Sequence, residues 1–196
     1  MVKPVVLQRN NFSGRLNLNS VFNVVWLTGM SGSGKSTLAS FIKTAFQKEG
    51  FKVQIIDGDD VRDQDSNKLG FGLEDVEINN LRIAKLCLEL KNRDYDLVLV
   101  PVISPYDRVR KKTREILEPY YHLVYVKAEV ESLRKRDTKG LYKAADQGEI
   151  TDLIGYSLTN PYEEPNDADL ILNTDNRLLI GKTKQLFQGF VDSIII

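Results

Sequence analysis

The sequence predicts an α/β fold: a three-layer sandwich in which helices cover both faces of a mostly parallel β-sheet. Two observations predict this fold class. The expected strands are apolar along their whole length, as is typical of strands buried on both faces. Along the chain they alternate with segments in which apolar residues recur at helical spacing.

The first half of this alternation can be followed element by element. Residues 21–28 form a β-branched and aromatic run that predicts a buried strand. Residues 38–46 have helical apolar spacing, and Gly50 is typical of the position just beyond a helix. The apolar run 53–56 predicts the second strand, and leucine and isoleucine at helical spacing over residues 74–92 predict the next helix.

The second half continues in the same order, with one long interruption. The elements expected there are a strand at 97–103, a charged helix at 107–118, a strand at 123–126, a short helix around Leu133, a strand at 170–173 and a C-terminal helix through Leu186 and Phe190. The interruption, residues 138–165, contains no core-like strand. Because so long an irregular stretch in a compact domain is usually functional, we expect a lid over the site there.

Composition excludes several classes of protein. The 27 Lys and Arg balance 27 Asp and Glu, so there is no basic field to attract nucleic acid. The apolar runs at both ends are too short for a signal peptide or a bilayer span. A single cysteine, Cys87, excludes a disulfide framework. We expect a cytoplasmic protein with no nucleic-acid or membrane partner, made of a polar lead-in (1–20) and one domain (21–196).

A phosphate-binding loop, or P-loop, is predicted at residues 29–37. Their sequence, Gly-Met-Ser-Gly-Ser-Gly-Lys-Ser-Thr, fits G-x-x-x-x-G-K-[ST] and stands between an expected strand and an expected helix. In such loops backbone N–H groups face the phosphates, the lysine bridges the β- and γ-phosphates, and the serine hydroxyl ligates Mg²⁺. The predicted ATP-binding residues are Gly29, Ser31, Gly32, Ser33, Gly34, Lys35, Ser36 and Thr37. An accidental Gly/Ser turn is the other interpretation, which the flanking strand and helix disfavour.

A guanine-nucleotide switch would carry a base-recognition segment Asn-Lys-x-Asp. Residues 67–70, Asn-Lys-Leu-Gly, lack the aspartate, which favours a kinase.

A second group of charged residues follows the second strand, in the sequence Asp57-Gly58-Asp59-Asp60-Val61-Arg62. Since parallel strands end at one edge of the sheet, Asp59 would lie where it can orient an acceptor hydroxyl and take its proton. Asp57 would hold Mg²⁺ through a water, and Arg62 would neutralise acceptor charge. Spacing alone supports equally well a helix N-cap, which aspartate commonly forms.

Seven motifs in order resemble the adenylylsulfate (APS) kinase family. They are the phosphate loop, the Asp57–Arg62 segment, Leu69-Gly70-Phe71, Ile103-Ser104-Pro105-Tyr106, Lys139-Gly140-Leu141-Tyr142-Lys143, Gly148-Glu149-Ile150 and Pro161-Tyr162-Glu163, and the match runs from about Val24 to Thr174. The resemblance implies a P-loop kinase that transfers the ATP γ-phosphoryl group to the 3′-hydroxyl of adenosine 5′-phosphosulfate, giving the activated sulfate donor PAPS. It also implies Mg²⁺ and a homodimer.

The resemblance also implies roles for single residues. Lys35 and Ser36 keep their donor roles, and Asp59 matches the catalytic aspartate. The residues implied on the acceptor side are Arg62, Phe71, Asn79, Ile103, Ser104, Lys139, Leu141 and Leu153, with Phe71 and Leu153 as the two faces of an adenine clamp. Ser104 matches a serine that some members phosphorylate. Because no histidine stands nearby to activate it, we favour a turn and pocket role over a catalytic one.

Departures from the family pattern fall on the acceptor side. Gln64-Asp65-Ser66 replaces Gly-Leu-Asn, Val76 and Asp107 replace arginines, and Leu153 replaces an aromatic residue. A lost arginine contact costs about 1.5–3 kcal/mol and a lost base stack about 1–3 kcal/mol. Two alternatives therefore stay open: a related kinase acting on another activated nucleotide such as cytidine diphosphoramidate, and a non-catalytic nucleotide-binding regulator. Intact Lys35, Ser36 and Asp59 disfavour the regulator.

Overall fold

A five-stranded parallel sheet forms the centre of the computed structural model, which describes residues 21–63 and 69–195. The lead-in 1–20 and the departure Gln64-Asp65-Ser66 lie outside the described residues. The strand order is β2-β3-β1-β4-β5. The strands are β1 (Asn23–Thr28), β2 (Val53–Ile55), β3 (Leu97–Pro101), β4 (Tyr121–Lys127) and β5 (Leu170–Asn173).

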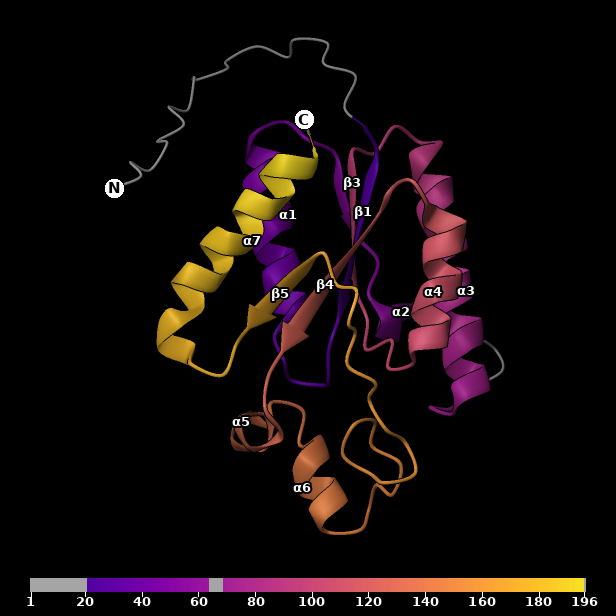
Figure 1. The fold of residues 1–196 in the computed structure, drawn as a ribbon, viewed down its shortest axis with the longest axis vertical. Coiled ribbons are helices and arrows are strands. Elements are labelled where there is room, and N and C mark those ends of the chain that lie inside the picture. The colour runs from indigo at the N-terminus through magenta and orange to yellow at the C-terminus, as the bar shows by residue number, and fades with distance from the viewer. Residues whose placement is uncertain (1–20, 64–68, 196) are drawn as a thin grey trace.

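Helices cover both faces of the sheet, which confirms the predicted three-layer α/β sandwich. The helices are α1 (Lys35–Lys48), α2 (Gly58–Asp63), α3 (Leu73–Lys91), α4 (Asp107–Leu117), α5 (Val130–Arg136), α6 (Leu141–Asp146) and α7 (Ile180–Ile194), with a 3₁₀ turn at Arg177–Leu179. Figure 1 shows α1 and α7 on one face, and α3 and α4 on the other.

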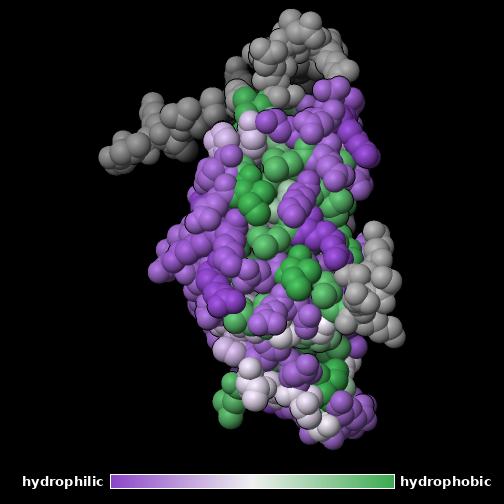
Figure 2. All heavy atoms as spheres, turned by 90° about the vertical axis from the view of Figure 1, so that its right-hand side faces the viewer, coloured by the Kyte–Doolittle hydropathy of each residue, from purple (hydrophilic) through white to green (hydrophobic). Residues whose placement is uncertain are grey.

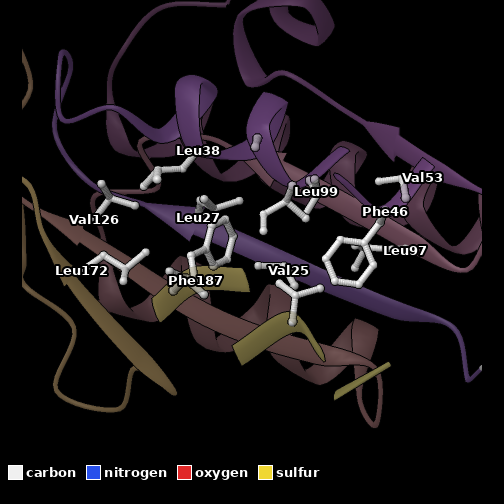
Figure 3. Close-up of a cluster of buried hydrophobic side chains, with 14 of the residues drawn as sticks. Val25, Leu27, Leu38, Phe46, Val53, Leu97, Leu99, Val126, Leu172 and Phe187 are labelled. Atoms are coloured by element: carbon white, nitrogen blue, oxygen red, sulfur yellow. The ribbon is translucent and has the colours of Figure 1, made fainter. Parts of the chain in front are cut away.

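The central strand β1 explains why these runs are apolar throughout. All six of its residues are buried. Val25 and Leu27 belong to the cluster that includes Phe187 of α7, as Figure 3 shows. Val24 and Trp26 belong to the cluster on the other face, below α3 and α4. A strand whose side chains pack into a core on both faces of the sheet must be apolar throughout. The apolar run therefore predicted the position of β1 correctly.

The face formed by α3 and α4 is largely hydrophilic, with apolar side chains scattered between the polar ones (Figure 2). Glu77 of α3 pairs there with Arg108, at 3.2 Å, and with Lys112 of α4. In the part of the chain that the structure describes, no helix is long and apolar enough to cross a membrane.

Most expected elements are present, with shifted ends. The third strand ends at Pro101 instead of residue 103, and the fourth begins at Tyr121 instead of residue 123. The 138–165 segment contains no strand, as expected, but it does contain helix α6. Figure 1 places α5, α6 and the following loop beyond the end of the sheet toward which the β4 and β5 arrowheads point. That end holds the carboxyl ends of the strands, where ligands bind in open α/β sheets.

Candidate active site

The carboxyl edge of the sheet opens into a pocket of about 760 Å³, a volume typical of small-molecule sites. Its walls come from the phosphate loop, the start of α2, the end of β3 and the 138–165 segment. The predicted residues that line it are Ser31, Gly32, Ser33, Gly34, Lys35, Ser36, Thr37, Asp57, Asp59, Arg62, Phe71, Ile103, Lys139, Leu141 and Leu153. The structure thus brings the predicted ATP-binding residues other than Gly29, and most of the predicted acceptor-binding residues, into one cavity.

The phosphate loop owes its curvature to glycine. Gly29 has a φ of 149°, and a Cβ there would stand 2.4 Å from the Val126 carbonyl oxygen. Gly34 has a φ of 102° at the N-cap of α1. Other residues rarely adopt such angles, so glycine at these positions lets the loop turn from β1 into α1. The N-terminus of α1, which favours anions, follows directly.

Lys35 is buried under this loop. Its Nζ donates hydrogen bonds to the carbonyl oxygens of Gly29, at 2.7 Å, and Met30, at 2.9 Å. Burial lowers the pKa of Lys35 to about 7, although the nearby Asp59 charge opposes the shift. A bound phosphate group would therefore stabilise the charged form of Lys35.

Asp57 links the phosphate loop to α2. Its Oδ1 accepts a hydrogen bond from the backbone N–H of Asp59 at 3.0 Å, and its Oδ2 accepts one from Ser36 Oγ at 3.4 Å. Asp57 therefore caps α2, as the N-cap interpretation expected, while its carboxylate also faces the loop. A hydroxyl and a carboxylate are the hard oxygen ligands that Mg²⁺ takes in phosphoryl-transfer sites.

Asp59 stands in the first turn of α2, with its side chain 62% exposed. Its Oδ2 accepts a hydrogen bond from Lys139 Nζ at 2.7 Å, and this bond raises the pKa of Lys139. Asp59 and Lys35 line the same pocket, on the same edge of the sheet. This is the arrangement that transfer between a bound triphosphate and an acceptor hydroxyl requires.

Arg62 and Phe71 lie together on one wall of the pocket. The Arg62 guanidinium lies 4.6 Å from the centre of the Phe71 ring and donates to the Gly70 carbonyl. Phe71 is 45% exposed, whereas Leu153 is buried beside Leu133 and Tyr142. Both proposed clamp residues thus line the pocket, one aromatic and one aliphatic.

Asn79 and Ser104 are not among the residues that line the main pocket. Asn79 is fully buried and its Nδ2 donates to the Gly58 carbonyl at 3.2 Å, so it supports the start of α2. Ser104 is buried, with a φ of 44°, and its Oγ accepts a hydrogen bond from Asn80 Nδ2 at 2.7 Å. It lines a small recess of about 20 Å³ that adjoins Asp59. Ser104 therefore lies beside the recess and outside the main pocket, and the role that we favour for it stays a prediction.

Two residues that depart from the family pattern, Val76 and Asp107, lie in different surroundings. Val76 is buried against Tyr106, Val109 and Ile154, and it lines the same recess. Asp107 pairs with Lys111 at 2.7 Å on the surface of α4. The recess therefore has an aliphatic wall at the position where the family resemblance implies an arginine.

Sequence reasoning missed several lining residues. Asn80 contributes to the recess, and Arg136, Thr174 and Ile180 line the main pocket. Thr174 Oγ1 donates to the Ser33 carbonyl at 2.8 Å, and Arg136 donates to the Asp175 carbonyl at 3.1 Å. A signal was present for Thr174, because it follows the last strand directly and strand ends form this edge of the sheet.

The site combines a parallel α/β sheet, a glycine-rich loop leading into a helix, a buried loop lysine and a carboxylate in the helix that follows β2. These features define an ATP-dependent P-loop kinase. A family model described as adenylylsulphate kinase matches residues 22–173. The chain belongs to the adenylylsulphate kinase family.

Named relatives agree with this assignment. A probable adenylyl-sulfate kinase of Aeropyrum pernix is 38% identical over 168 residues, which cover 84% of this chain and 90% of that protein. An adenylyl-sulfate kinase of Bacillus pumilus is 36% identical over 186 residues, covering 94% and 91%. The solved Mycobacterium tuberculosis APS kinase CysC in complex with AMPPNP and APS matches with a TM-score of 0.76 at 31% identity, covering 87% of this chain and 96% of that one.

Proposed function

We propose that the protein transfers the γ-phosphoryl group of ATP to the 3′-hydroxyl of adenosine 5′-phosphosulfate, giving PAPS. The observation that carries the proposal is the shared pocket of Lys35 and Asp59. The names of the relatives support the acceptor, and the M. tuberculosis complex supports a site that holds an ATP analogue and APS together.

On the donor side, the loop N–H groups and Lys35 bind the triphosphate. Ser36 Oγ and, through water, Asp57 would hold Mg²⁺, and their oxygens fit that ion. When bound, Mg²⁺ neutralises charge on the β- and γ-phosphates. Lys35 adds a further positive charge beside the carbonyl oxygens of Gly29 and Met30, which keep its Nζ at the loop.

On the acceptor side, Asp59 orients the hydroxyl and accepts its proton. A bond forms between the acceptor oxygen and the γ-phosphorus, the bond from that phosphorus to the β–γ bridging oxygen breaks, and ADP leaves. Arg62 and Lys139 face the negative charge of the acceptor, and Phe71 and Leu153 hold its base. Ser104 acts as a wall residue, since direct in-line transfer needs no covalent intermediate.

We propose that the 138–165 segment is a lid that excludes water from the transfer. Its Gly155 approaches Met30 of the phosphate loop so closely that a Cβ would stand 2.7 Å from the Met30 Cε. Lys139, from the same segment, reaches Asp59. A closed lid suppresses hydrolysis of ATP, because the hydroxyl then has no competing water.

One observation favours a second acceptor, a nucleotide with a phosphoramidate end such as cytidine diphosphoramidate. Asn80 is 1% exposed, and its Oδ1 has no hydrogen-bond partner among the described residues. A buried acceptor oxygen is stabilised by a donor. Sulfate oxygens only accept hydrogen bonds, whereas an amine donates them. The aliphatic Val76 wall also suits an end group of lower charge.

A coupled assay of ADP release separates these proposals. ATP is supplied with adenosine 5′-phosphosulfate, with cytidine diphosphoramidate or with no acceptor, and the products are identified by mass spectrometry. We expect ADP only with an acceptor and turnover with adenosine 5′-phosphosulfate. Turnover with the cytidine compound alone would replace the leading acceptor. No ADP with any acceptor would favour the non-catalytic regulator.

We further propose a cytoplasmic homodimer. The family resemblance supports the dimer, and the free, buried thiol of Cys87 suits a reducing compartment. Light scattering coupled to size-exclusion chromatography tests the dimer, since a mass of one chain at micromolar concentration would contradict it.

A further inference from the structure

Two carbonyl groups of the phosphate loop are held by hydroxyls from distant parts of the chain. The Ser31 carbonyl accepts a hydrogen bond from Tyr142 Oη at 2.9 Å, and the Ser33 carbonyl accepts one from Thr174 Oγ1 at 2.8 Å. Tyr142 belongs to α6 in the 138–165 segment, and Thr174 follows β5.

These contacts bear on the direction of the loop N–H groups. In a trans peptide the C=O and N–H bonds point in opposite directions, so a carbonyl held on one side fixes the following N–H on the other. The N–H groups that follow belong to Gly32, with a φ of 77°, and Gly34, with a φ of 102°. Because the backbone at glycine is conformationally free, the orientation of these peptides depends most on hydrogen bonds from outside the loop.

The side chain of Tyr142 is well fixed for this purpose. It is 2% exposed, and its ring meets Tyr156 edge-on at 5.4 Å. Its backbone N–H donates to Asp137 Oδ1 at 3.0 Å. Tyr142 is not among the residues that line the main pocket, whereas Ser31 and Gly32 are. The Ser31 carbonyl is therefore drawn toward the body of the 138–165 segment.

We propose that Tyr142 is a positioning residue for the donor site: its hydroxyl holds the Ser31–Gly32 peptide so that the Gly32 N–H faces the ATP phosphates. The 138–165 segment would then support the donor loop as well as cover the acceptor. Thr174 holds the Ser33–Gly34 peptide in the same way. The proposal rests on the kinase function proposed above, but ATP binding tests it without turnover.

The first experiment is Tyr142→Phe, which keeps the ring and removes the hydroxyl. Binding of AMPPNP and of inorganic tripolyphosphate is measured by isothermal titration calorimetry. We expect the Kd of both to rise about three- to tenfold, the range that follows from losing one neutral hydrogen bond. In assays at saturating ATP, the KM for the acceptor should stay within twofold.

The matched control is Tyr156→Phe. Tyr156 belongs to the same segment and its hydroxyl donates to Asp146, away from the loop. We expect its AMPPNP Kd to stay within twofold of the original. An equal rise in both variants would overturn the proposal, since it would mean that the segment had loosened as a whole. An unchanged Kd in Tyr142→Phe would also overturn it.

A second variant keeps the proposal testable if Tyr142→Phe does not fold. Thr174→Val preserves the shape of the side chain and frees the Ser33 carbonyl. We expect a similar rise in the Kd of tripolyphosphate, and an unchanged value would contradict the role of the two hydroxyls. If the original protein binds AMPPNP but shows no turnover with any acceptor, the proposed reaction is wrong, and the role of Tyr142 is still decided by the titrations of the variants.

Discussion

Lys139 and Asp59 form an ion pair across the pocket, with Lys139 Nζ 2.7 Å from Asp59 Oδ2. The pair joins the 138–165 segment to the first turn of α2. The ammonium group of Lys139 thus contacts the carboxylate that we propose takes the proton of the acceptor hydroxyl. An acceptor that enters this end of the pocket meets both groups. Because Asp59 is assigned the proton and Lys139 the negative charge of the acceptor, loss of Asp59 should lower kcat and loss of Lys139 should raise the KM for the acceptor.

Asp59→Asn should lower kcat at least tenfold while the Kd of AMPPNP is retained. The amide keeps the size of the side chain but cannot take the hydroxyl proton. Asp60→Asn is a matched control, since Asp60 is an exposed neighbour in the same turn and is not among the residues that line the pocket. Near-normal turnover of Asp59→Asn would remove this residue from the mechanism.

Lys139→Met should raise the KM for the acceptor at least tenfold, about 1.4 kcal/mol of binding, because a charge-assisted contact to an anion is lost. Both partners of the ion pair are about 60% exposed. The free energy of unfolding should therefore change by less than about 1 kcal/mol. Steady-state kinetics and urea unfolding measure the two effects.

Lys143→Met serves as the control for that variant. Lys143 is exposed on α6, in the same segment as Lys139, and does not line the main pocket. Equal effects of the two substitutions on the acceptor KM would indicate a general charge effect of the segment, against the specific contact proposed here.

ATP binding should be accompanied by proton uptake at Lys35. Burial lowers the pKa of Lys35 from 10.5 to about 7 in the free protein, and bound phosphates should raise it again. The expected uptake is about half a proton at pH 7 and about 0.9 at pH 8. Titration calorimetry in two buffers with different ionisation enthalpies measures it. Equal binding enthalpies in both buffers at pH 8 would contradict the prediction.

The same shift has a consequence for stability. Because the folded pKa of Lys35 lies below its ordinary value, the unfolded chain binds the extra proton between about pH 7 and 10.5. The contribution of Lys35 should therefore make the free energy of unfolding rise with pH in this window. Comparing urea unfolding of the original protein with Lys35→Met at pH 7 and pH 9 isolates that contribution.

Leu153→Phe should lower the KM for an adenine acceptor. A second aromatic side chain in the pocket that Phe71 also lines would add stacking of about 1–3 kcal/mol per base. Leu153 is 8% exposed beside Leu133 and Tyr142, so the larger ring should also cost about 1–3 kcal/mol of stability. An unchanged KM for adenosine 5′-phosphosulfate in a folded variant would indicate that its base lies elsewhere. Thermal unfolding monitors the fold.

The sheet and the donor site could be predicted from the sequence because their signals are local. A strand such as β1, with all six residues buried, must be apolar throughout, and the phosphate loop is one continuous motif. The position of Asp59 in the same pocket as Lys35 could be predicted too, because parallel strands end at a common edge.

The remaining contacts depend on packing that no local pattern encodes. Asn79 and Asn80 are neighbours of one type, yet helix geometry turns the first toward Gly58 and the second toward Ser104. Tyr142 and Ser31 are 111 residues apart in the chain. Helix α6 was missed because six residues are too few to give a clear helical period.

The close approach of Gly155 to Met30 makes these two positions interdependent. Gly155 has a φ of 77°, and its missing side chain is what lets the thioether of Met30 rest against the backbone. Any larger residue at position 155 would clash with Met30 and push the 138–165 segment away from the phosphate loop. Among related enzymes, a bulkier residue at one of these positions should therefore occur with a smaller one at the other.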